Sequence, residues 1–257
     1  MSIRSVLINV VDVHNSVDFY LRHLGGELVG QRNEDEATID FVTGTITLQR
    51  LARGGAASTW IPDDLQLGFR HLGFKVADLD ARVAELKSAG VPFHLDTIHA
   101  EGGVRLTFFY DPDGTLLEFV EGPLQYHEVF DRAAVDADWA LGEPDRPRLD
   151  HVAETVADLD KTIADYSELG WSLMSGIHQA NDARGFEIAY LRSGDTSLEV
   201  FTFARAELQR RAPQLDAPGF LAVELDGSSA SADVVGRLDD GLGVAVDADG
   251  LQRLVGE

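Results

Sequence analysis

The sequence predicts an α+β fold assembled from four repeats of a β-α-β-β-β unit. The first observation is a long internal repeat: residues 71–90, HLGFKVADLDARVAELKSAG, recur at 151–170 as HVAETVADLDKTIADYSELG. Both copies have His first, Val-Ala-Asp-Leu-Asp in the middle and Gly last, and a match of this length indicates repeated structural units. The second observation is that each copy combines strand-like alternation with helical spacing and is followed by three strand-like runs. Weaker versions of the pattern lie near both ends of the chain.

The composition is that of a globular protein. The chain of 257 residues is 44% hydrophobic, which is enough to bury a sizeable core. Its sequence has no apolar run near the ~20 residues that a membrane helix needs, and residues 1–12 lack the layout of a signal peptide. We therefore expect a cytoplasmic protein.

The charge and the cysteine count exclude several classes of function. The formal net charge is −23, and there is no cysteine. Nucleic acids and anionic membranes are also negatively charged, so repulsion argues against both as partners. The lack of cysteine excludes disulfides, thiolate nucleophiles and cysteine-ligated metals, so any metal ion must be held by histidine and carboxylate side chains.

Residues 1–52 form the first predicted unit. Alternation over residues 5–12 indicates a strand, and apolar residues at helical spacing then continue to Leu24, where two glycines end the helix. The unit is completed by three strand-like runs, at residues 27–32, 38–42 and 45–51.

Residues 68–122 form the second unit, after a connector at residues 52–67. Its helix is predicted to bury Leu79, Val83 and Leu86, which recur with helical spacing. Three strands should follow, and an Asp-Pro-Asp-Gly sequence predicts the turn between the last two. The strands are predicted at residues 91–97, 104–110 and 115–120.

Residues 123–147 form a second connector, which contains prolines and has helical character at 129–141. The third unit, residues 148–204, repeats the pattern of the second. The fourth, residues 218–257, is shortened: it keeps a first strand, a serine-rich helix start and two short strands.

A single unit cannot be stable alone. Its helix covers one face of the sheet and leaves the other face and an edge exposed, so the units must pair. Leu72, Phe74 and Val76 alternate toward the helix, whereas His71 and Gly73 face the space that two paired units enclose.

On these features the sequence resembles the vicinal oxygen chelate superfamily, which includes glyoxalase I, methylmalonyl-CoA epimerase, extradiol dioxygenases and bleomycin- or fosfomycin-resistance proteins. The resemblance covers nearly the whole chain. It rests on the His that begins the first strand, the Val-Ala-Asp-Leu-Asp corner, and the last hairpin, DPDGTLLEF at 111–119 with GDTSLEVF at 194–201. It implies four units paired into two half-open barrels, with metal ligands on the first and last strands of a unit. The reaction stays open, because this scaffold hosts several chemistries.

The resemblance places metal ligands at His71 and Glu118 in the second unit and at His151 and Glu199 in the third. The two spacings agree, at 47 and 48 residues. Imidazole nitrogens and carboxylate oxygens suit one divalent ion of Fe, Mn, Co, Ni or Zn, and four such ligands leave room for substrate. Glu118 also lies in an apolar run, where a buried carboxylate without a metal ion or partner would be costly.

The first and fourth units lack these ligands. They have Ser5 and Gly219 at the His position, and the first has Leu48 or Gln49 at the Glu position. Our hypothesis is that units two and three pair around one complete metal site, while units one and four form a metal-free barrel. The alternative is pairing in chain order, which would leave half a site in each barrel.

Four further residues are candidates for contact with a substrate. Arg105 and Arg184 each begin a strand beside a glycine-containing loop and could bind a carboxylate or phosphate. Tyr126 and His127 follow the second unit and are expected over the barrel mouth, as acid–base groups or as supports for the metal ligands.

Three functions remain possible for a protein with a small-molecule partner, which we expect to be a monomer or a homodimer. The first is a lyase or isomerase of glyoxalase or epimerase type, in which Glu118 or Glu199 carries a proton. The second is an Fe(II) extradiol-type dioxygenase, which usually has two His and one Glu. The third is a non-enzymatic, drug-sequestering binding protein, which the retained His and Glu residues disfavour.

Overall fold

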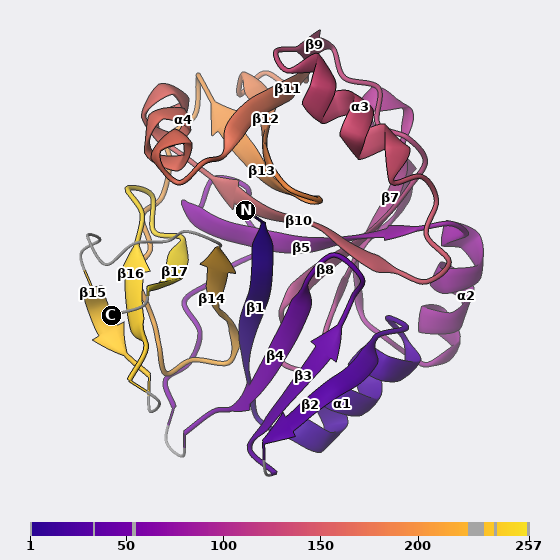
Figure 1. Ribbon diagram of the computed structural model, residues 1–257, viewed down its shortest axis with the longest axis vertical. Helices are drawn as coiled ribbons and strands as arrows, with labels where there is room; N and C mark the ends of the chain where they lie inside the picture. Colours follow the sequence, from indigo (N-terminus) through magenta and orange to yellow (C-terminus); the bar gives the residue numbers. More distant parts are fainter. Residues whose placement is uncertain (1, 33, 53–54, 226–233, 239–240, 256–257) are drawn as a thin grey trace.

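A computed structural model describes residues 2–32, 34–52, 55–225, 234–238 and 241–255. The strands of these residues form an eight-stranded and a nine-stranded sheet, and each sheet curls into a half-open barrel (Figure 1). The predicted α+β class is therefore confirmed. Among the residues described, no helix combines the length and the apolar character needed to cross a bilayer.

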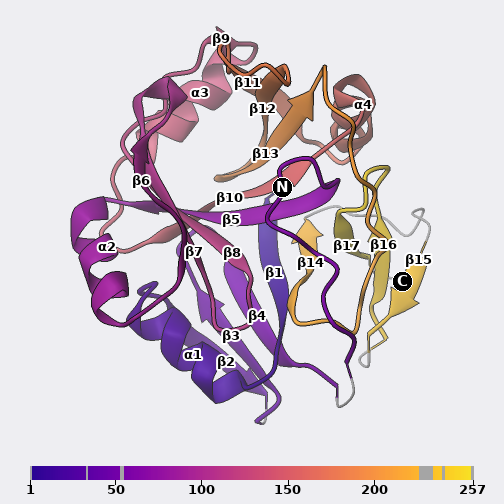
Figure 2. The same cartoon turned by 180° about the vertical axis from the view of Figure 1, so that it is seen from behind.

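The nine-stranded sheet, called here the second-and-third-unit barrel, contains strands from residues 68–203. The first strands of the two units, β5 and β10, pair antiparallel at its centre, and they cross the middle of the molecule in both views (Figures 1 and 2). The strands in spatial order are β6 (Phe93–His99), β7 (Arg105–Tyr110), β8 (Leu116–Glu121), β5 (Gly68–Val76), β10 (Arg148–Thr155), β13 (Thr196–Phe203), β12 (Phe186–Ser193), β11 (Ser172–His178) and β9 (Glu128–Val129).

The eight-stranded sheet, called here the first-and-fourth-unit barrel, joins the two ends of the chain. Its central pair is β1 with β14. The strands in order are β15 (Val234–Arg237), β16 (Gly243–Val246), β17 (Gln252–Val255), β14 (Gly219–Leu225), β1 (Ile3–Val10), β4 (Thr45–Arg50), β3 (Glu36–Asp40) and β2 (Glu27–Arg32). This strand order confirms the predicted pairing and excludes pairing in chain order.

The fourth unit differs from its prediction. Three short strands, β15, β16 and β17, follow its first strand, where two were expected. The predicted serine-rich helix start falls on residues 226–233, which lie outside the described residues.

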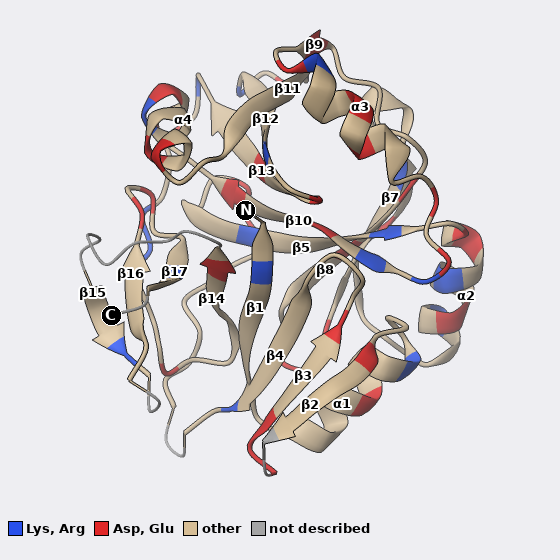
Figure 3. Cartoon of the chain, in the orientation of Figure 1, with Lys and Arg blue, Asp and Glu red and all other residues tan. Residues whose placement is uncertain are grey.

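The Val-Ala-Asp-Leu-Asp motif marks the corner between the first strand and the helix. Its first Asp is the N-cap: Asp78 accepts a hydrogen bond from the backbone N–H of Ala81, and Asp158 accepts one from Lys161. Such caps satisfy backbone donors that the first helical turn leaves free. The α-helices are α1 (Val13–Arg22), α2 (Leu79–Ser88), α3 (Arg132–Ala140) in the connector and α4 (Leu159–Glu168), and each carries acidic residues (Figure 3).

Both central strands of the second-and-third-unit barrel contain a β-bulge. Ala153 pairs with His71 but Glu154 pairs with Phe69, so Arg70 between them has no partner position. Asp150 is skipped in the same way, between the pairs of Leu149 and His151. A bulge redirects side chains locally. As a result, two consecutive residues of each strand face the barrel interior, which simple alternation did not predict.

The two barrels pack against each other through their outer faces. One hydrophobic core includes the helix-facing side chains of both sheets, and the Phe41 and Phe74 rings meet across it at 4.9 Å. The Tyr20 hydroxyl, on α1, donates a 2.9 Å hydrogen bond to Asp111 in the turn of the second unit. The barrel interiors are therefore separate from this shared core and free to differ.

Candidate metal centre

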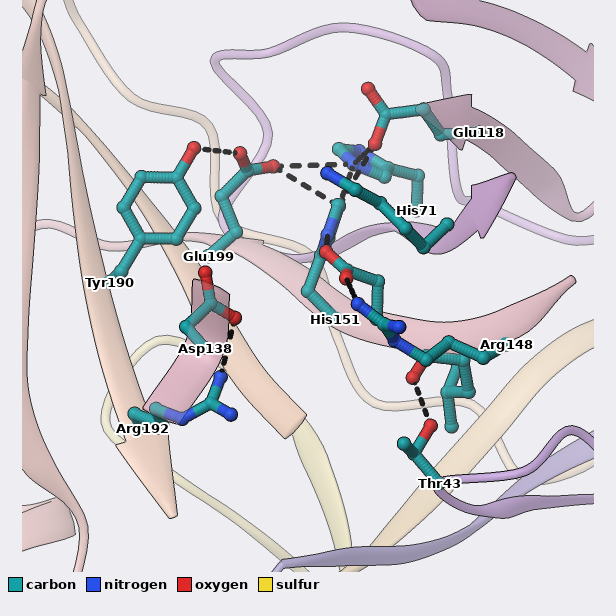
Figure 4. A network of polar contacts seen from close by, with 12 residues as sticks. Thr43, His71, Glu118, Asp138, Arg148, His151, Tyr190, Arg192 and Glu199 are labelled. Carbon is teal, nitrogen blue, oxygen red and sulfur yellow. Dashed lines mark hydrogen bonds and ion pairs between the residues drawn. The ribbon is translucent and has the colours of Figure 1, made fainter. Parts of the chain in front are cut away.

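Four ionisable side chains meet inside the second-and-third-unit barrel (Figure 4). His71 comes from β5, His151 from β10, Glu118 from β8 and Glu199 from β13. One ligand atom from each lies within 4.8 Å of the others, and all four residues are buried. The structure thus brings together the predicted ligand set.

The four side chains point at one small region. The two Nε2 atoms of His71 and His151 are 3.0 Å apart. Oε2 of Glu118 lies 3.0 Å from Nε2 of His151, and Oε2 of Glu199 lies 3.3 Å from Nε2 of His71. Two nitrogens and two oxygens therefore surround a common point.

These donors fit a divalent cation. Oε2 of Glu118 is buried, and the ring nitrogens of His151 and His71 lie 3.0 and 3.5 Å from it, so the atoms nearest to it could share an ion with it. Two imidazole nitrogens facing each other at 3.0 Å can share only one proton, which leaves at least one lone pair for a metal ion. Histidine and carboxylate are the ligands expected for such an ion in a protein without cysteine.

Without an ion, hydrogen bonds and opposite charges stabilise the same four side chains. Burial alone would raise the pKa of Glu118, but hydrogen bonds from His151 and His71 outweigh it and lower that pKa to about 2. Burial alone would lower the pKa of His151, but the charge of Glu199 and the hydrogen bond to Asp150 hold it well above its ordinary value. The pocket therefore already stabilises positive charge beside the carboxylates.

Gly73 makes room for the His151 ring. It pairs with His151 across β5 and β10, and a Cβ atom at this position would lie 2.1 Å from Cε1 of that ring. No side chain fits there unless the imidazole moves. The absence of a side chain at residue 73 is thus part of the site.

Asp150 supports His151 and was not predicted as a site residue. Nδ1 of His151 lies 3.1 Å from Oδ2 of Asp150, and a carboxylate there favours the tautomer that keeps Nε2 free for an ion. Burial would raise the pKa of Asp150, but the His151 hydrogen bond and the charge of Lys75 hold it well below its ordinary value. The missed signal was an acid directly before one of the two repeated histidines.

Tyr190 supports Glu199 and was also missed. Its hydroxyl donates a 2.7 Å hydrogen bond to Oε1 of Glu199, and the two residues are cross-strand neighbours. The neighbour of Glu118 in the equivalent position is Phe108, which has no hydrogen to donate. The two carboxylates therefore have different surroundings, which a comparison of the two hairpins in the sequence could have shown.

Two cavities reach the cluster. The larger, of about 520 Å³, is lined by His71 among others, and the smaller, of about 250 Å³, by His151. Glu118 and Glu199 line both. A small molecule in the larger cavity would therefore lie against the cluster.

The predicted substrate residues lie in different places. Arg105 lines neither cavity: its guanidinium pairs with Asp80 and Glu121, on the side of the sheet that faces α2, so the structure does not bring Arg105 to the cluster. Arg184 lines neither cavity, and its guanidinium pairs with Asp182 at 2.7 Å and, at 3.5 Å, with Asp64, which lines the larger cavity.

The two predicted connector residues, Tyr126 and His127, lie in different places. Tyr126 lines the smaller cavity, and its hydroxyl donates a 2.9 Å hydrogen bond to Asp138. His127 lines neither cavity: its Nδ1 accepts a hydrogen bond from the backbone N–H of His178, and the two imidazole rings stack. Of this pair, the structure brings Tyr126 toward the site and leaves His127 at the surface of the connector.

The same positions in the first-and-fourth-unit barrel carry other residues. Leu7 pairs with Thr47 and Ala222 as Gly73 pairs with Glu118 and His151. Thr47 therefore replaces the predicted Leu48 or Gln49 as the counterpart of Glu118. Ala222 likewise replaces the predicted Gly219 as the counterpart of His151, because strand register decides equivalence.

Comparison with known proteins agrees with this arrangement. Residues 2–119 match the family model described as the Glyoxalase/Bleomycin resistance protein/Dioxygenase superfamily. The uncharacterized protein YwkD of Bacillus subtilis is 30% identical over 127 residues, 47% of this chain and 96% of YwkD. The uncharacterized protein YaeR of Escherichia coli is 46% identical over 54 residues, and the match spans 42% of its length and 21% of this chain.

A solved structure extends the likeness to the whole chain. Glyoxalase I from Zea mays superimposes with a TM-score of 0.66 at 18% sequence identity, over 99% of this chain and 91% of that one. At this identity the likeness concerns the fold.

Proposed function

We propose that this chain, which belongs to the glyoxalase/bleomycin resistance protein/dioxygenase superfamily, is a metal-dependent enzyme of glyoxalase or epimerase type. Its substrate would be a small molecule with vicinal oxygens, on which it moves a proton. The observation that carries the proposal is the convergence of four buried His and Glu donors beside a cavity of about 520 Å³.

His71, His151, Glu118 and Glu199 would hold one divalent ion of Fe, Mn, Co, Ni or Zn. When bound, such an ion acts as a Lewis acid that stabilises negative charge on the vicinal oxygens of the substrate. Asp150 orients His151 through Nδ1, and Gly73 leaves the space that the ring occupies.

Glu118 is the better candidate to carry the proton. Glu199 is held by the Tyr190 hydroxyl at 2.7 Å, whereas the cross-strand neighbour of Glu118 is Phe108, so the partners of Glu118 in the cluster are the two histidines. A carboxylate that accepts and returns a proton must be free to turn toward the substrate carbon. In this assignment Glu199 stays in place as a ligand.

The alternatives fit the site less well. An extradiol-type dioxygenase usually uses two His and one Glu, and here both carboxylates lie in the cluster. A drug-sequestering protein has no need of four buried ionisable groups, whose burial is costly without an ion.

The first test is metal analysis of the purified protein and of His71→Ala and Glu199→Ala. We expect one bound ion per chain, lost in both variants. The matched control is Ser5→Ala, which changes the counterpart of His71 in the other barrel and should keep the ion. Retention of the ion in either site variant would overturn the shared site.

The second test separates the reactions and the two carboxylates. Turnover of methylglyoxal–thiol adducts is measured beside oxygen uptake with catechols, and oxygen uptake would favour the dioxygenase. For the proton carrier, Glu118→Gln should lower kcat about 100-fold or more with the ion still bound. Tyr190→Phe, which removes the tether of Glu199, should mainly weaken metal binding. The reverse pattern would make Glu199 the proton carrier.

A further inference from the structure

The β-bulge before each site histidine places a second ionisable side chain beside it. In β10 this residue is Asp150, which contacts His151. In β5 it is Arg70, which lines the larger cavity together with His71, Glu118 and Glu199. Asp150 supports a candidate ligand, whereas Arg70 pairs with Ile61 and Asp64 and with none of the four clustered residues, so its burial needs another explanation.

The guanidinium of Arg70 is buried with incomplete pairing. The residue is 2% exposed, and its Nε has no hydrogen-bond partner. Nη1 donates a long 3.3 Å hydrogen bond to the Ile61 carbonyl, and the nearest carboxylate, on Asp64, is 3.7 Å away. That carboxylate is also shared with Arg184. A buried charge with such weak partners is costly unless another group completes the pairing.

The other barrel shows that burial of this position is not imposed by the fold. Arg4 occupies the equivalent bulge in β1, where the register skips from Ile3 to Ser5. Its side chain is 61% exposed and pairs with Glu224 at 3.2 Å. Arginine at this position thus forms a surface ion pair in the first-and-fourth-unit barrel, as Arg4, and lines a cavity in the second-and-third-unit barrel, as Arg70.

The rest of the cavity is suited to a compact apolar body. Among the described residues that line it, Arg70 carries the one fixed positive charge, and apolar side chains form much of the wall. The apolar lining includes Leu95, Ile98, Leu106, Phe108, Phe186 and Phe201. The volume of about 520 Å³ falls within the range of sites for small molecules.

We infer that the substrate carries a carboxylate, separate from its vicinal oxygens and joined to them by a short apolar or aromatic segment, and that Arg70 binds this carboxylate. The inference rests on the proposed function, because it places the vicinal oxygens at the four-residue cluster. Guanidinium recognises planar oxyanions through hydrogen bonds, and a carboxylate would supply a closer partner for Nη2, which has the Asp64 carboxylate 3.7 Å away. Asp64 and Glu101 also line the cavity, so a singly charged carboxylate suits it better than a phosphate.

The experiment uses two matched chelating probes, 4-carboxybenzohydroxamate and 4-carbamoylbenzohydroxamate. Both offer two vicinal oxygens on an aromatic body, and they differ in the far charge. Their dissociation constants are measured by titration calorimetry on the full chain loaded with Zn²⁺ or Ni²⁺, with metal content determined in the same samples. The variants are Arg70→Met, Arg70→Lys and, as the control, Arg105→Met, whose guanidinium lies outside the cavity.

The wild type should bind the carboxylate probe about tenfold or more tightly than the amide probe, the size expected for a hydrogen-bonded charge pair. Arg70→Met should abolish this preference and leave the metal content and the affinity for the amide probe within about twofold. Arg70→Lys should restore part of the preference, and Arg105→Met should keep all of it.

Two results would overturn the inference in different ways. Equal affinity of wild type for both probes, or a preference that survives in Arg70→Met, would remove Arg70 as the carboxylate site and leave the metal-dependent function standing. No binding of either hydroxamate to protein supplied with metal would reject the proposed function itself, and with it the substrate inference.

Discussion

The two barrels share one architecture and fill their interiors in opposite ways. At the four equivalent positions, the second-and-third-unit barrel has His71, Glu118, His151 and Glu199. The first-and-fourth-unit barrel has Ser5, Thr47 and Ala222, and the register of β14 with β17 places Leu254 at the fourth position. Ser5 and Thr47 hydrogen-bond to each other at 3.1 Å, so their polar groups need no ion.

The contrast is clearest at the residue that pairs with two of these positions, which is Gly73 in one barrel and Leu7 in the other. Gly73 leaves space for an imidazole ring, whereas Leu7 at the same position is buried in an apolar cluster with Ala222 and Leu254. The first-and-fourth-unit barrel thus has apolar packing around this position. The second-and-third-unit barrel has four buried ionisable side chains there instead. Since buried polar groups need partners, this exchange costs apolar packing, which an ion held by the four side chains would offset.

The largest expected effect comes from making the two barrels alike at this position. In Gly73→Leu the new side chain would overlap the His151 ring, which must leave the cluster. We expect a loss of metal affinity of about 100-fold or more, beyond the upper end of what indirect supports cost. The measurement is a metal titration followed by calorimetry or by competition with a chelator.

The reciprocal variant is the control. Leu7→Ala should lower the free energy of unfolding by about 2–5 kcal/mol, as core truncations do, and leave metal affinity unchanged. If Leu7→Ala reduced metal affinity as strongly, the barrels would not be independent, and the contrast drawn between them would fail.

A smaller effect is expected from Asp150→Asn. This variant keeps the shape of the side chain but removes the negative charge that faces Nδ1 of His151. Metal affinity should fall about 10- to 100-fold, the range for residues that orient a ligand. Asp160→Asn, at the exposed start of α4, serves as the matched control, and an unchanged affinity in Asp150→Asn would show that Nδ1 does not need the carboxylate.

The smallest expected effect tests the contact between the barrels. Burial raises the pKa of Asp111, which accepts the Tyr20 hydrogen bond, to about 6. Because the folded state keeps this proton at a pH where the unfolded chain has lost it, stability from this group is greatest below pH ~4 and falls as pH rises to ~6. Lowering the pH from 7.5 to 5 should therefore stabilise the wild type by about 1 kcal/mol relative to Asp111→Asn.

Urea unfolding of both proteins at the two pH values measures this difference. The comparison with Asp111→Asn isolates one carboxyl group from the others that titrate in the same range. A difference between the two proteins that does not change with pH would mean that Asp111 titrates alike in the folded and unfolded chains.

The sequence was sufficient for the repeat, because the repeat is a local signal, and the resemblance to a known superfamily pointed to the four residues that cluster. The Asp of the Val-Ala-Asp-Leu-Asp corner caps a helix in both copies, and each His lies at nearly the same distance from its Glu, 47 and 48 residues. The structure places Arg105 away from the cluster, which the sequence did not indicate because a residue at a strand start can point to either face. The guanidinium of Arg105 pairs with Asp80 of α2, and this contact forms because α2 covers the face of the sheet to which Arg105 points.

What the sequence alone determined was therefore the unit, its periodicity and the chemical identity of the candidate site. Only the tertiary structure decided that the second and third units share a barrel and that bulges turn Arg70 and Asp150 inward. It also placed Tyr190 beside Glu199 and showed that Gly73 makes room for His151. The physical reason is that periodicity is set by neighbours in the chain, whereas register between strands is set by long-range pairing, and a shift of one residue reverses the face of every side chain.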